Sequence, residues 1–519
     1  DGTAGAVRIT AGSDVAVVQG QSLTLNGVID NRGDLELRTV GNLTDLIVNG
    51  AVELRGGGEV LLLNNSANRI YSNVAGSVLT NTDNRIAGAG EIFSNSNMRL
   101  DNKSGGLVEA DNVANALTLN SILVNNEGEL AARGGGLRIV SATIDNIGAG
   151  RIVADGTTAT IQSSNIQGGV LRTLGDGRID LNGATLDGRN GDPVEIDAGS
   201  TVRILNNTGS TLRGELANRG DLVFASVGSP TDLIVRGEAR LTGGGELLLT
   251  AGPSASRIYG GEAGSVLTNV DNRIAGTGTI FSNSGMRFEN GAAGVVDATG
   301  ASPLRFNSIV VTNDGLLKAS AGGLLQIWSA SVAGGDAGRI RAEGAGARVE
   351  LNAAIITGGV LESSGGGVIA PQNSTLDGTV DAVRIAEGAL VRIENNHTAY
   401  LKGAIDNQGR IELTSVGSPT NLIVQGAVTL SGGGTVALTQ STTRLYGNPT
   451  SSLTNVDNVV GGVGEVLSLL QSFTNGAAGV VEARGGTLNL NPASFTNEGL
   501  LRAAASSVLN VGDTALTNY

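Results

Sequence analysis

Apolar and polar residues alternate in short stretches from one end of the chain to the other. Leu23–Leu25, Leu35–Leu37, Leu117–Leu119 and Leu488–Leu490 each carry a polar residue between two leucines. Alternation with a period of two predicts β-strands that bury one face and expose the other. No segment carries a sustained helical pattern with caps, so we expect no long helix.

These stretches return about every 19–22 residues, usually after Asn-x-Gly or Gly-Gly, as in NNEGELAARGGGLRIVSATIDN. A propeller would need blades of about 40 residues, and a sandwich would not need so constant a period. The short period predicts an all-β parallel β-solenoid, in which each coil stacks on the one before it. With about 4.8 Å between paired strands, about 25 coils would form a rod of roughly 120 Å.

A longer repeat is superimposed on this short one. VGNLTDLIVNG at Val40–Gly50 returns as VGSPTDLIVRG at Val227–Gly237 and as VGSPTNLIVQG at Val416–Gly426, at offsets of 187 and 189 residues. We therefore divide the chain into repeats of residues 1–186, 187–376 and 377–519, the third of them incomplete. At about nine coils per full repeat, we expect the three to form one continuous solenoid and to be a portion of a longer fibre.

Glycine occupies 81 positions and proline only 8, which fits neither a collagen repeat nor a proline-rich linker. The triplets Gly56–Gly58, Gly243–Gly245 and Gly432–Gly434 occur once per repeat, and none continues into a phosphate-binding motif. We expect them at corners of the coil, where glycine adopts a positive φ without strain. We also expect stacked asparagines to form ladders of side-chain hydrogen bonds.

Composition alone excludes several classes of function. Cysteine is absent and histidine occurs once, so disulfides, thiolate metal sites and the HExxH zinc motif are impossible. The net charge of -14 argues against nucleic acid and anionic membrane surfaces as partners. No run of about 18 apolar residues exists, so we expect no insertion into a membrane as a helix.

Strings such as LTNVDNRIAGTGTIFSNSGMRF, LVNNEGELAARGGGLRI and FTNEGLLRA resemble the repeats of filamentous-haemagglutinin-type adhesins and other large bacterial exoproteins. The resemblance covers essentially the whole chain. It implies a right-handed parallel β-helix in a secreted or surface-anchored bacterial fibre, exported through an outer-membrane partner or its own barrel. The expected location is therefore extracellular or on the outer cell surface.

The expected function is that of a non-enzymatic fibre or adhesin shaft, which serves cell adhesion, aggregation or biofilm structure. Its expected partners are further copies of itself, in filaments or bundles, and a surface receptor or glycan that the sequence does not name. Two alternatives stay open: a phage tail fibre or spike, and a carbohydrate-active β-helix enzyme.

Candidate catalytic carboxylates recur with the repeat. Asp83, Asp271 and Asp457 occupy equivalent positions, and so do Asp187 and Asp377. A catalytic constellation is usually singular, whereas recurring aspartates typically cap turns through hydrogen bonds from side chain to backbone. We therefore expect no catalytic and no cofactor-binding residue.

Two isolated features suggest other chemistry. Gly175–Gly183 faintly resembles a calcium loop, but Arg178 and Leu181 stand where an EF-hand needs a ligand and a glycine. Calcium is thus the one cofactor that we weigh, mainly on the acidic balance, and we assign no metal ligand. His397 is the single histidine, and although histidine is the usual pH switch, we expect it in a surface loop.

Two RGD tripeptides stand at equivalent positions of the first two repeats. They are Arg32-Gly33-Asp34 and Arg219-Gly220-Asp221, and the third repeat has Gln408-Gly409-Arg410 in that place. Integrins recognise RGD, and some haemagglutinin-type adhesins carry it, so these six residues are the candidate adhesion motif. The alternative is chance, because a glycine-rich repeat readily produces such a tripeptide and then duplicates it.

Overall fold

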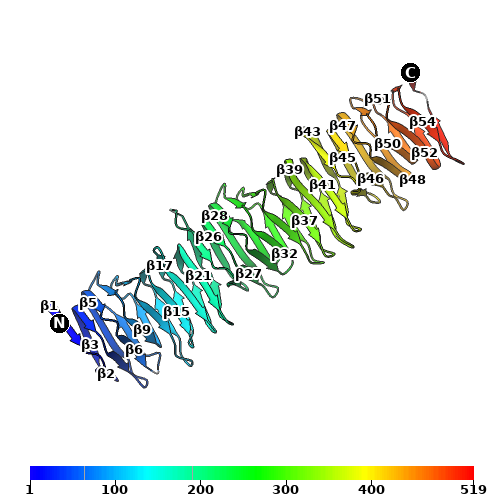
Figure 1. The fold of residues 1–519 in the computed structure, drawn as a ribbon. Coiled ribbons are helices and arrows are strands. Elements are labelled where there is room, and N and C mark those ends of the chain that lie inside the picture. The colour runs from blue at the N-terminus through cyan, green and yellow to red at the C-terminus, as the bar shows by residue number, and fades with distance from the viewer. Residues whose placement is uncertain (64, 190, 513) are drawn as a thin grey trace. The chain divides into compact units, whose positions relative to one another are not determined.

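The computed structural model describes residues 1–63, 65–189, 191–512 and 514–519. Within these residues all regular secondary structure is β-strand, from β1 to β56 (Figure 1). No helix that could span a membrane is found among them. The strands wind into a parallel β-solenoid of about 23 turns with about 22 residues per turn. This confirms the predicted fold, with coils at the upper end of the predicted length; its handedness stays a prediction.

Two compact units, residues 1–250 and 251–519, divide the chain. Within each unit a coil contributes a strand to each of three faces, and strands of successive coils pair in parallel. Some strands are long enough to bend around a corner and belong to two faces. We name the faces A, B and C in the first unit and D, E and F in the second, in the order in which the chain visits them.

Face A contains β7 (Asn68–Tyr71), β10 (Gly90–Phe93), β13 (Leu117–Asn120), β16 (Leu137–Val140), β19 (Thr158–Gln162), β22 (Arg178–Asn182), β25 (Thr201–Leu205), β27 (Asp221–Ala225) and β29 (Glu246–Thr250). Face B contains β1 (Gly2–Ile9), β8 (Val78–Asn81), β11 (Arg99–Asn102), β14 (Leu123–Asn126), β17 (Thr143–Asn146), β20 (Asn165–Gln167) and β23 (Thr185–Gly188).

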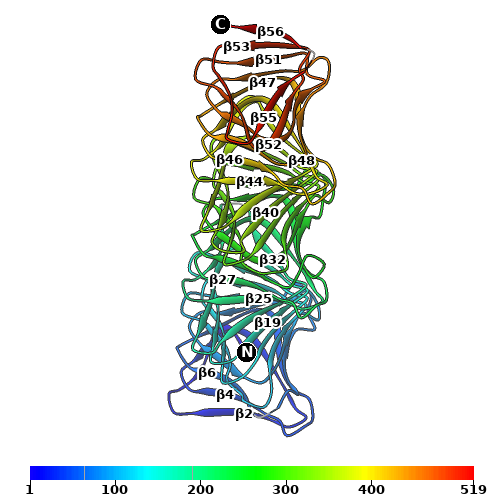
Figure 2. The same ribbon diagram turned by 90° about the vertical axis from the view of Figure 1, so that its right-hand side faces the viewer.

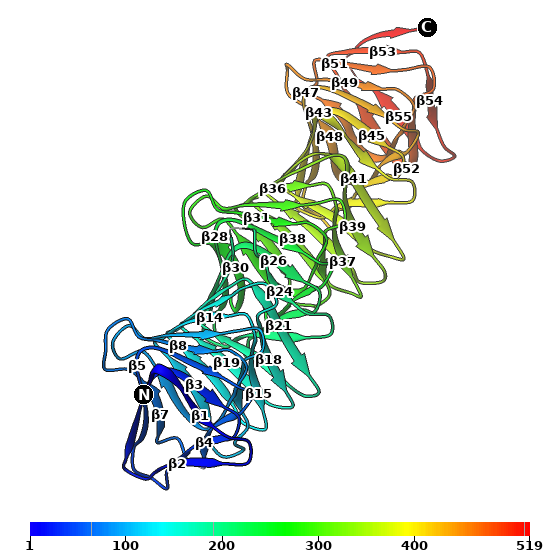
Figure 3. The ribbon, with the colours of Figure 1, turned by 60° about the vertical axis from the view of Figure 1, so that its left-hand side comes forward.

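Face C contains β2 (Asp14–Val18), β4 (Asp34–Arg38), β6 (Glu59–Leu63), β9 (Arg85–Gly88), β12 (Leu107–Ala110), β15 (Glu129–Arg133), β18 (Arg151–Asp155), β21 (Gly169–Leu174) and β24 (Val194–Ile196). Figure 2 shows β2, β4 and β6 one above the other, and Figure 3 shows β15 beside β18. Four long strands turn corners: β3 (Ser22–Asn31) and β5 (Thr44–Arg55) from A to B, and β26 (Gly209–Asn218) and β28 (Thr231–Thr242) from B to C.

Face D of the second unit begins with β31 (Val266–Asn269), β33 (Arg287–Asn290) and β36 (Val310–Asn313) and ends with β55 (Val508–Val511). Face E contains β34 (Val295–Ala298), β37 (Leu316–Ser320), β49 (Ser452–Asn455), β51 (Ser472–Asn475), β53 (Ser494–Asn497) and β56 (Ala515–Asn518). Five strands bend from D to E: β39 (Ser331–Glu343), β41 (Ile355–Ser364), β43 (Ser374–Ile385), β45 (Thr398–Asn407) and β47 (Thr420–Ser431).

Face F contains β30 (Ser256–Gly260), β35 (Leu304–Asn307), β38 (Leu324–Trp328), β40 (Arg348–Asn352), β42 (Val368–Gln372), β44 (Leu390–Ile393), β46 (Arg410–Leu413) and β54 (Leu500–Ala503). Strand β32 (Arg273–Phe281) bends from E to F. Strands β48 (Thr435–Tyr446), β50 (Val459–Ser468) and β52 (Val480–Leu490) bend from F to D.

The core of each unit is a column of aliphatic side chains inside the coils. Along β6 and β29, inward residues are buried and their neighbours are partly exposed, as the alternation predicts. Leu35, Leu62 and Leu79 are fully buried examples. Five of the seven phenylalanines are also fully buried, and Phe473 and Phe495 of adjacent coils stack with centroids 5.0 Å apart.

Buried asparagines form the predicted ladders at one corner of the coils. Asn81 Nδ2 donates to Asn102 Oδ1 at 2.9 Å, and Asn102 donates in the same way to Asn126. The second unit has an equivalent ladder through Asn455 and Asn475, also at 2.9 Å. Because a buried amide that lacked partners would destabilise the fold, each ladder holds its coils in one register.

The length of one sequence repeat is not a whole number of coils. From β4, eight steps on face C lead through β6, β9, β12, β15, β18, β21 and β24 to β26. The next strand is β27, the counterpart of β4 in the second repeat, and it lies on face A. A repeat thus fills eight coils and one further face, not the nine coils expected, so each repeat is turned by one face relative to the last. The second unit has the same shift, since β31 lies on face D and its counterpart β49 on face E.

Candidate functional site

Both RGD tripeptides lie at a corner, and the aspartate of each is the first residue of a strand, β4 or β27. The central glycines, Gly33 and Gly220, are buried, and a Cβ atom there would come within 2.3 Å of a backbone oxygen of the preceding coil. The same restriction applies to Gly409 of the third repeat, at 2.5 Å, so packing explains why glycine stands in all three places.

The two arginines of these tripeptides are engaged in ion pairs. Arg32 Nε lies 3.0 Å from Asp30 Oδ1, and Arg219 Nη1 lies 2.7 Å from Glu195 Oε1. Their side chains nevertheless remain more than half exposed. The structure does not bring the two tripeptides together on one face, and integrin binding stays a prediction.

The recurring aspartates bind backbone N–H groups, as expected for turn caps. Asp83 Oδ1 accepts a hydrogen bond from Gly57 N at 3.0 Å, and Asp457 Oδ1 accepts one from Gly433 N at 3.0 Å. Each carboxylate therefore caps the glycine corner of the preceding coil and not its own turn. At Gly57 and Gly433 φ is 73° and 75°, which confirms the positive φ predicted for the triplets.

The aspartates that open the second and third repeats cap their own turns. Asp187 accepts hydrogen bonds from the backbone N–H and the guanidinium of Arg189. These bonds, which outweigh the effect of burial, lower the pKa of Asp187. Asp377 accepts from the backbone N–H and the hydroxyl of Thr379, at 3.1 Å and 2.6 Å.

The remaining sequence candidates are also placed by the fold. His397 lies half-buried in the turn before β45, where its N–H donates to Glu394 O at 3.0 Å. In the segment that resembles a calcium loop, both oxygens of Asp180 are bound by Arg203 at 2.8 Å. No group of three or more His, Cys, Asp or Glu side chains arranged to hold a metal was found in the part of the chain that the structure describes. Calcium stays an expectation.

An exposed valine marks the same loop in each repeat. Val40, Val227 and Val416 are 80%, 87% and 90% exposed. Each backbone N–H is held by a side-chain oxygen of the preceding coil, from Gln19, Asn206 or Asn395 respectively. The loops are therefore well anchored, but single exposed valines are ordinary on protein surfaces and define no docking face by themselves.

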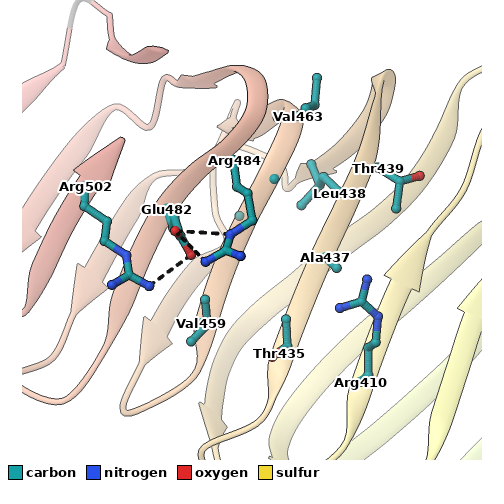
Figure 4. Close-up of a pocket in the computed structure, with 13 residues that line it drawn as sticks. Arg410, Thr435, Ala437, Leu438, Thr439, Val459, Val463, Glu482, Arg484 and Arg502 are labelled. Carbon is teal, nitrogen blue, oxygen red and sulfur yellow. Dashed lines mark hydrogen bonds and ion pairs between the residues drawn. The ribbon is translucent and has the colours of Figure 1, made fainter. Parts of the chain in front are cut away.

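A hollow of about 530 Å³ on face F of the third repeat is a site that the sequence did not suggest (Figure 4). Its lining comes from β46, β48, β50, β52 and β54. Ala437, Gly461 and Gly462 contribute little or no side chain, which leaves the surface low between the flanking residues. Arg410, Arg484, Arg502 and Glu482 surround it, and Figure 4 shows the two guanidiniums of Arg484 and Arg502 turned toward Glu482.

Charge in this hollow is unbalanced toward the positive. Glu482 accepts hydrogen bonds from Arg484 and Arg502, each through Nη2 at 3.1 Å. Arg410 donates to Glu412 at 2.8 Å, and Arg392 donates to the same carboxylate at 2.8 Å. Three arginines and one carboxylate thus line the hollow itself, in a chain whose net charge is -14. The arrangement can attract an anion, and it holds no general base beside a nucleophile.

The pKa of Glu482 reflects this environment. Burial raises the pKa, but hydrogen bonds from Arg502 and Arg484 outweigh burial and hold it below its ordinary value near 4.5. The pKa of Glu412 is lowered in the same way, since the bonds from Arg410 and Arg392 outweigh burial. Both carboxylates therefore stay ionised at neutral pH and keep their arginines in place.

Comparison with known proteins adds little to this picture. No family model and no curated protein matches the chain. Among solved structures, a TibC-catalysed hyper-glycosylated fragment of TibA aligns over 75% of this chain and 94% of its own, with 12% identity and a TM-score of 0.17. At that score the likeness carries no weight, and the fold assignment rests on the strand pairings themselves.

Proposed function

We propose that this chain is a non-enzymatic length of shaft in an extracellular bacterial fibre of the adhesin type. The observation that carries the proposal is the uniform stacking of coils within each unit, where every coil pairs in parallel with its neighbours. A solenoid of this kind gains length without a new core, because each added coil is stabilised by the coil beside it.

The fate of the candidate carboxylates supports the same proposal. Asp83, Asp187, Asp377 and Asp457 accept hydrogen bonds that close turns, and Asp180 is held by an arginine. An enzyme of this fold would need carboxylates that face a substrate cleft and are free to exchange a proton with the substrate. The repeat structure supports a role as spacer, since duplication of a whole block lengthens the stack and leaves its junctions unchanged.

Removal of one repeat tests the shaft role. Deletion of residues 187–376 joins Leu186 to Asp377 and restores the Thr-Leu-Asp-Gly junction found at both boundaries. The register supports this, because Leu186 pairs with Leu212 as Leu376 pairs with Leu401. We expect the shortened chain to fold cooperatively. When the shortened chain is displayed on a cell with a reporter domain fused to one end, we expect the reporter domain to keep its binding to its own ligand.

The matched control is an out-of-register deletion of residues 187–366, which joins Leu186 to Gly367 and breaks the pairing at the junction. It should lose β-structure near the cut, as measured by circular dichroism and hydrogen exchange. If the in-register deletion also unfolds, the repeats are not length modules and the shaft proposal fails.

A second measurement addresses catalysis. The purified chain is expected to leave acidic and neutral polysaccharides uncleaved over prolonged incubation. Turnover that disappears on changing one aspartate, while the circular dichroism spectrum is retained, would overturn the non-enzymatic assignment.

A further inference from the structure

Face F of the second repeat carries a hollow of about 540 Å³ that is lined in part by an aromatic ring. The ring is that of Phe281 of β32, and Pro253 and Pro303, in the loops before β30 and β35, are the other apolar residues of the lining. Polar groups reach the same space from Ser254, Arg257, Thr279, Arg305 and Asn307. This mixture of one ring, two prolines and a few polar groups is typical of small-molecule sites.

Partly exposed aromatic side chains gather around this hollow. The rings of Tyr259 and Phe281 lie with centroids 5.1 Å apart, and Trp328, the single tryptophan, is 39% exposed two coils further along the same row. Most phenylalanines of this chain are buried in the core. Aromatic rings at the surface are therefore scarce. The first repeat has an equivalent pair in Tyr71 and Phe93, so the third ring, Trp328, is what sets this place apart.

Arg305 is held in place by a neutral amide and not by a carboxylate. Its Nε and Nη2 both donate to Gln326 Oε1, at 2.9 Å and 2.7 Å, and its guanidinium lies 4.9 Å from the centroid of the Trp328 ring. Gln326 in turn donates to Glu350 at 2.8 Å. Among the residues that the structure describes, Arg305 forms no ion pair, so a neutral amide orients this cation and leaves its charge for a ligand.

The first repeat lacks the features that make this site. Glu91 stands where the second repeat has Thr279, Thr118 where it has Arg305, and Val140 where it has Trp328. Asn120 Nδ2 donates to Glu91 Oε1 at 2.7 Å, which places a carboxylate at the equivalent surface. The stacked pair of Tyr71 and Phe93 is retained at 5.0 Å. Charge and the third ring, not the backbone, distinguish the two places.

We propose that this hollow binds an acidic saccharide, a pyranose that carries a carboxylate or sulfate group. The C–H face of the sugar packs on the ring of Phe281 and against the two prolines, and the anionic group accepts hydrogen bonds from Arg305. Asn307 and Thr279 supply side-chain partners for hydroxyl groups. The inference deepens the proposed function, because it gives the shaft a ligand of its own, and its failure would leave the shaft role intact.

Binding of full-length chain to immobilised polygalacturonate, a carboxylated polymer, tests the proposal, with dextran sulfate and neutral dextran as further arms. Arg305→Gln removes the cation at a surface position and is expected to weaken binding by about tenfold or more. Phe281→Ala should weaken it to a similar degree. Phe93→Ala, the same change at the equivalent position of the first repeat, is the matched control and should leave binding unchanged.

The arms of the experiment separate the outcomes. Binding to polygalacturonate alone identifies the carboxylate as the recognised group. Binding to both charged polymers that is lost in Arg305→Gln shows that the site accepts a carboxylate or a sulfate group. Binding that is equal in wild type and Arg305→Gln, or that falls equally in Phe93→Ala, overturns the proposal. The proposal is also overturned if the chain binds neutral dextran as tightly as the charged polymers, or if it binds none of the three. Cooperative unfolding of each variant at the wild-type temperature shows that lost binding is not lost folding.

Discussion

The same row of strand positions has opposite chemistry in the first and third repeats. On face C of the first repeat, Arg85 reaches across the sheet and pairs with Glu59 at 3.3 Å, Glu109 at 2.5 Å and also with Asp111. On face F of the third repeat, Val459 stands in the place of Arg85. The first surface is covered by a salt-bridged side chain, and the second is hollow.

The neighbouring positions change together. Thr435 replaces Glu59, and Arg484 replaces Asp111, whereas Glu482 keeps the carboxylate of Glu109. The backbone ladders are the same in both places, since Glu59 pairs with Arg85 as Thr435 pairs with Val459. The coil thus fixes where side chains stand, whereas outward residues of adjacent coils together decide whether the surface is filled and which charge it carries.

The largest effect is expected at the glycine corners, which both regions share. A Cβ atom on Gly434 would lie 2.5 Å from Asn407 O and from Gly409 O, so Gly434→Val should lower the free energy of unfolding by about 3 kcal/mol or more. Gly433 has φ 75° and no atom within 4 Å, so Gly433→Val should cost only strain, about 1–3 kcal/mol. Denaturant titration checks the order.

The first repeat provides the control for this pair. A Cβ atom on Gly58 would lie 2.4 Å from Gly33 O, whereas one on Gly57, at φ 73°, would meet nothing within 4 Å. Valine should therefore again be worse at the third glycine of the triplet. Hydrogen exchange should confine the damage to a few coils, because each coil contacts only its neighbours. Equal losses at both positions, or a reversed order in one repeat, would show that the two corners differ.

A smaller effect is expected when the arginine of the first repeat is replaced by its counterpart in the third. Arg85→Val removes the cation that three carboxylates share, although Glu109 keeps Arg133 at 3.6 Å. A loss of about 1–2 kcal/mol is expected, since the Arg85 side chain is 28% exposed and solvent screens the charges. Val459→Arg is the reciprocal change. It places a cation beside Arg410 and Arg484, so it should fill the hollow with little gain in stability, and a large gain would contradict the electrostatic difference.

The smallest effect is expected in the pH dependence of the stability that Glu482 contributes to the third repeat. Because the folded pKa lies below its ordinary value near 4.5, ionised Glu482 stabilises the fold above that pH, and the contribution is lost as pH falls through the folded pKa. The difference in unfolding free energy between wild type and Glu482→Gln should be constant from about pH 6 to 8 and should shrink at acid pH. A difference for Glu482→Gln that grows as the pH falls would mean that Arg484 and Arg502 do not hold the ionised carboxylate.

Sequence reasoning reached the fold through local signals. The alternating stretches Leu35–Leu37 and Leu117–Leu119 were expected in strands, and they lie in β4 and β13. Turn-capping aspartates and asparagine ladders were also expected and are confirmed at Asp83 and at Asn81. These features depend on the residue itself and its immediate neighbours, or on one repeated spacing, and each of these is visible in a linear string.

The candidate surfaces could not be reached in that way. Arg484, Arg502 and Glu482 are brought together by pairing of β52 with β54, and Arg305 meets Trp328 through pairing of β35 with β38. The sequence does contain differences between repeats at these positions, such as Val459 in the third repeat where the first has Arg85. Their effect on the surface can be inferred only when it is known which residues are neighbours on adjacent coils.

The all-β character, the stacking of coils and the positions of the corners follow from the amino-acid sequence. The pleat makes alternation a property of one strand, and glycine at a positive φ is a property of one residue. The face that each strand occupies follows only from the way in which the coils pair. Asn102 and Asn126 lie 24 residues apart and Asn126 and Asn146 only 20, although each pair is one coil apart. Loops of unequal length absorb these differences, so neighbours across coils follow from hydrogen-bonded register and not from a fixed spacing, and the shift of one face per repeat emerges only when the coils are stacked.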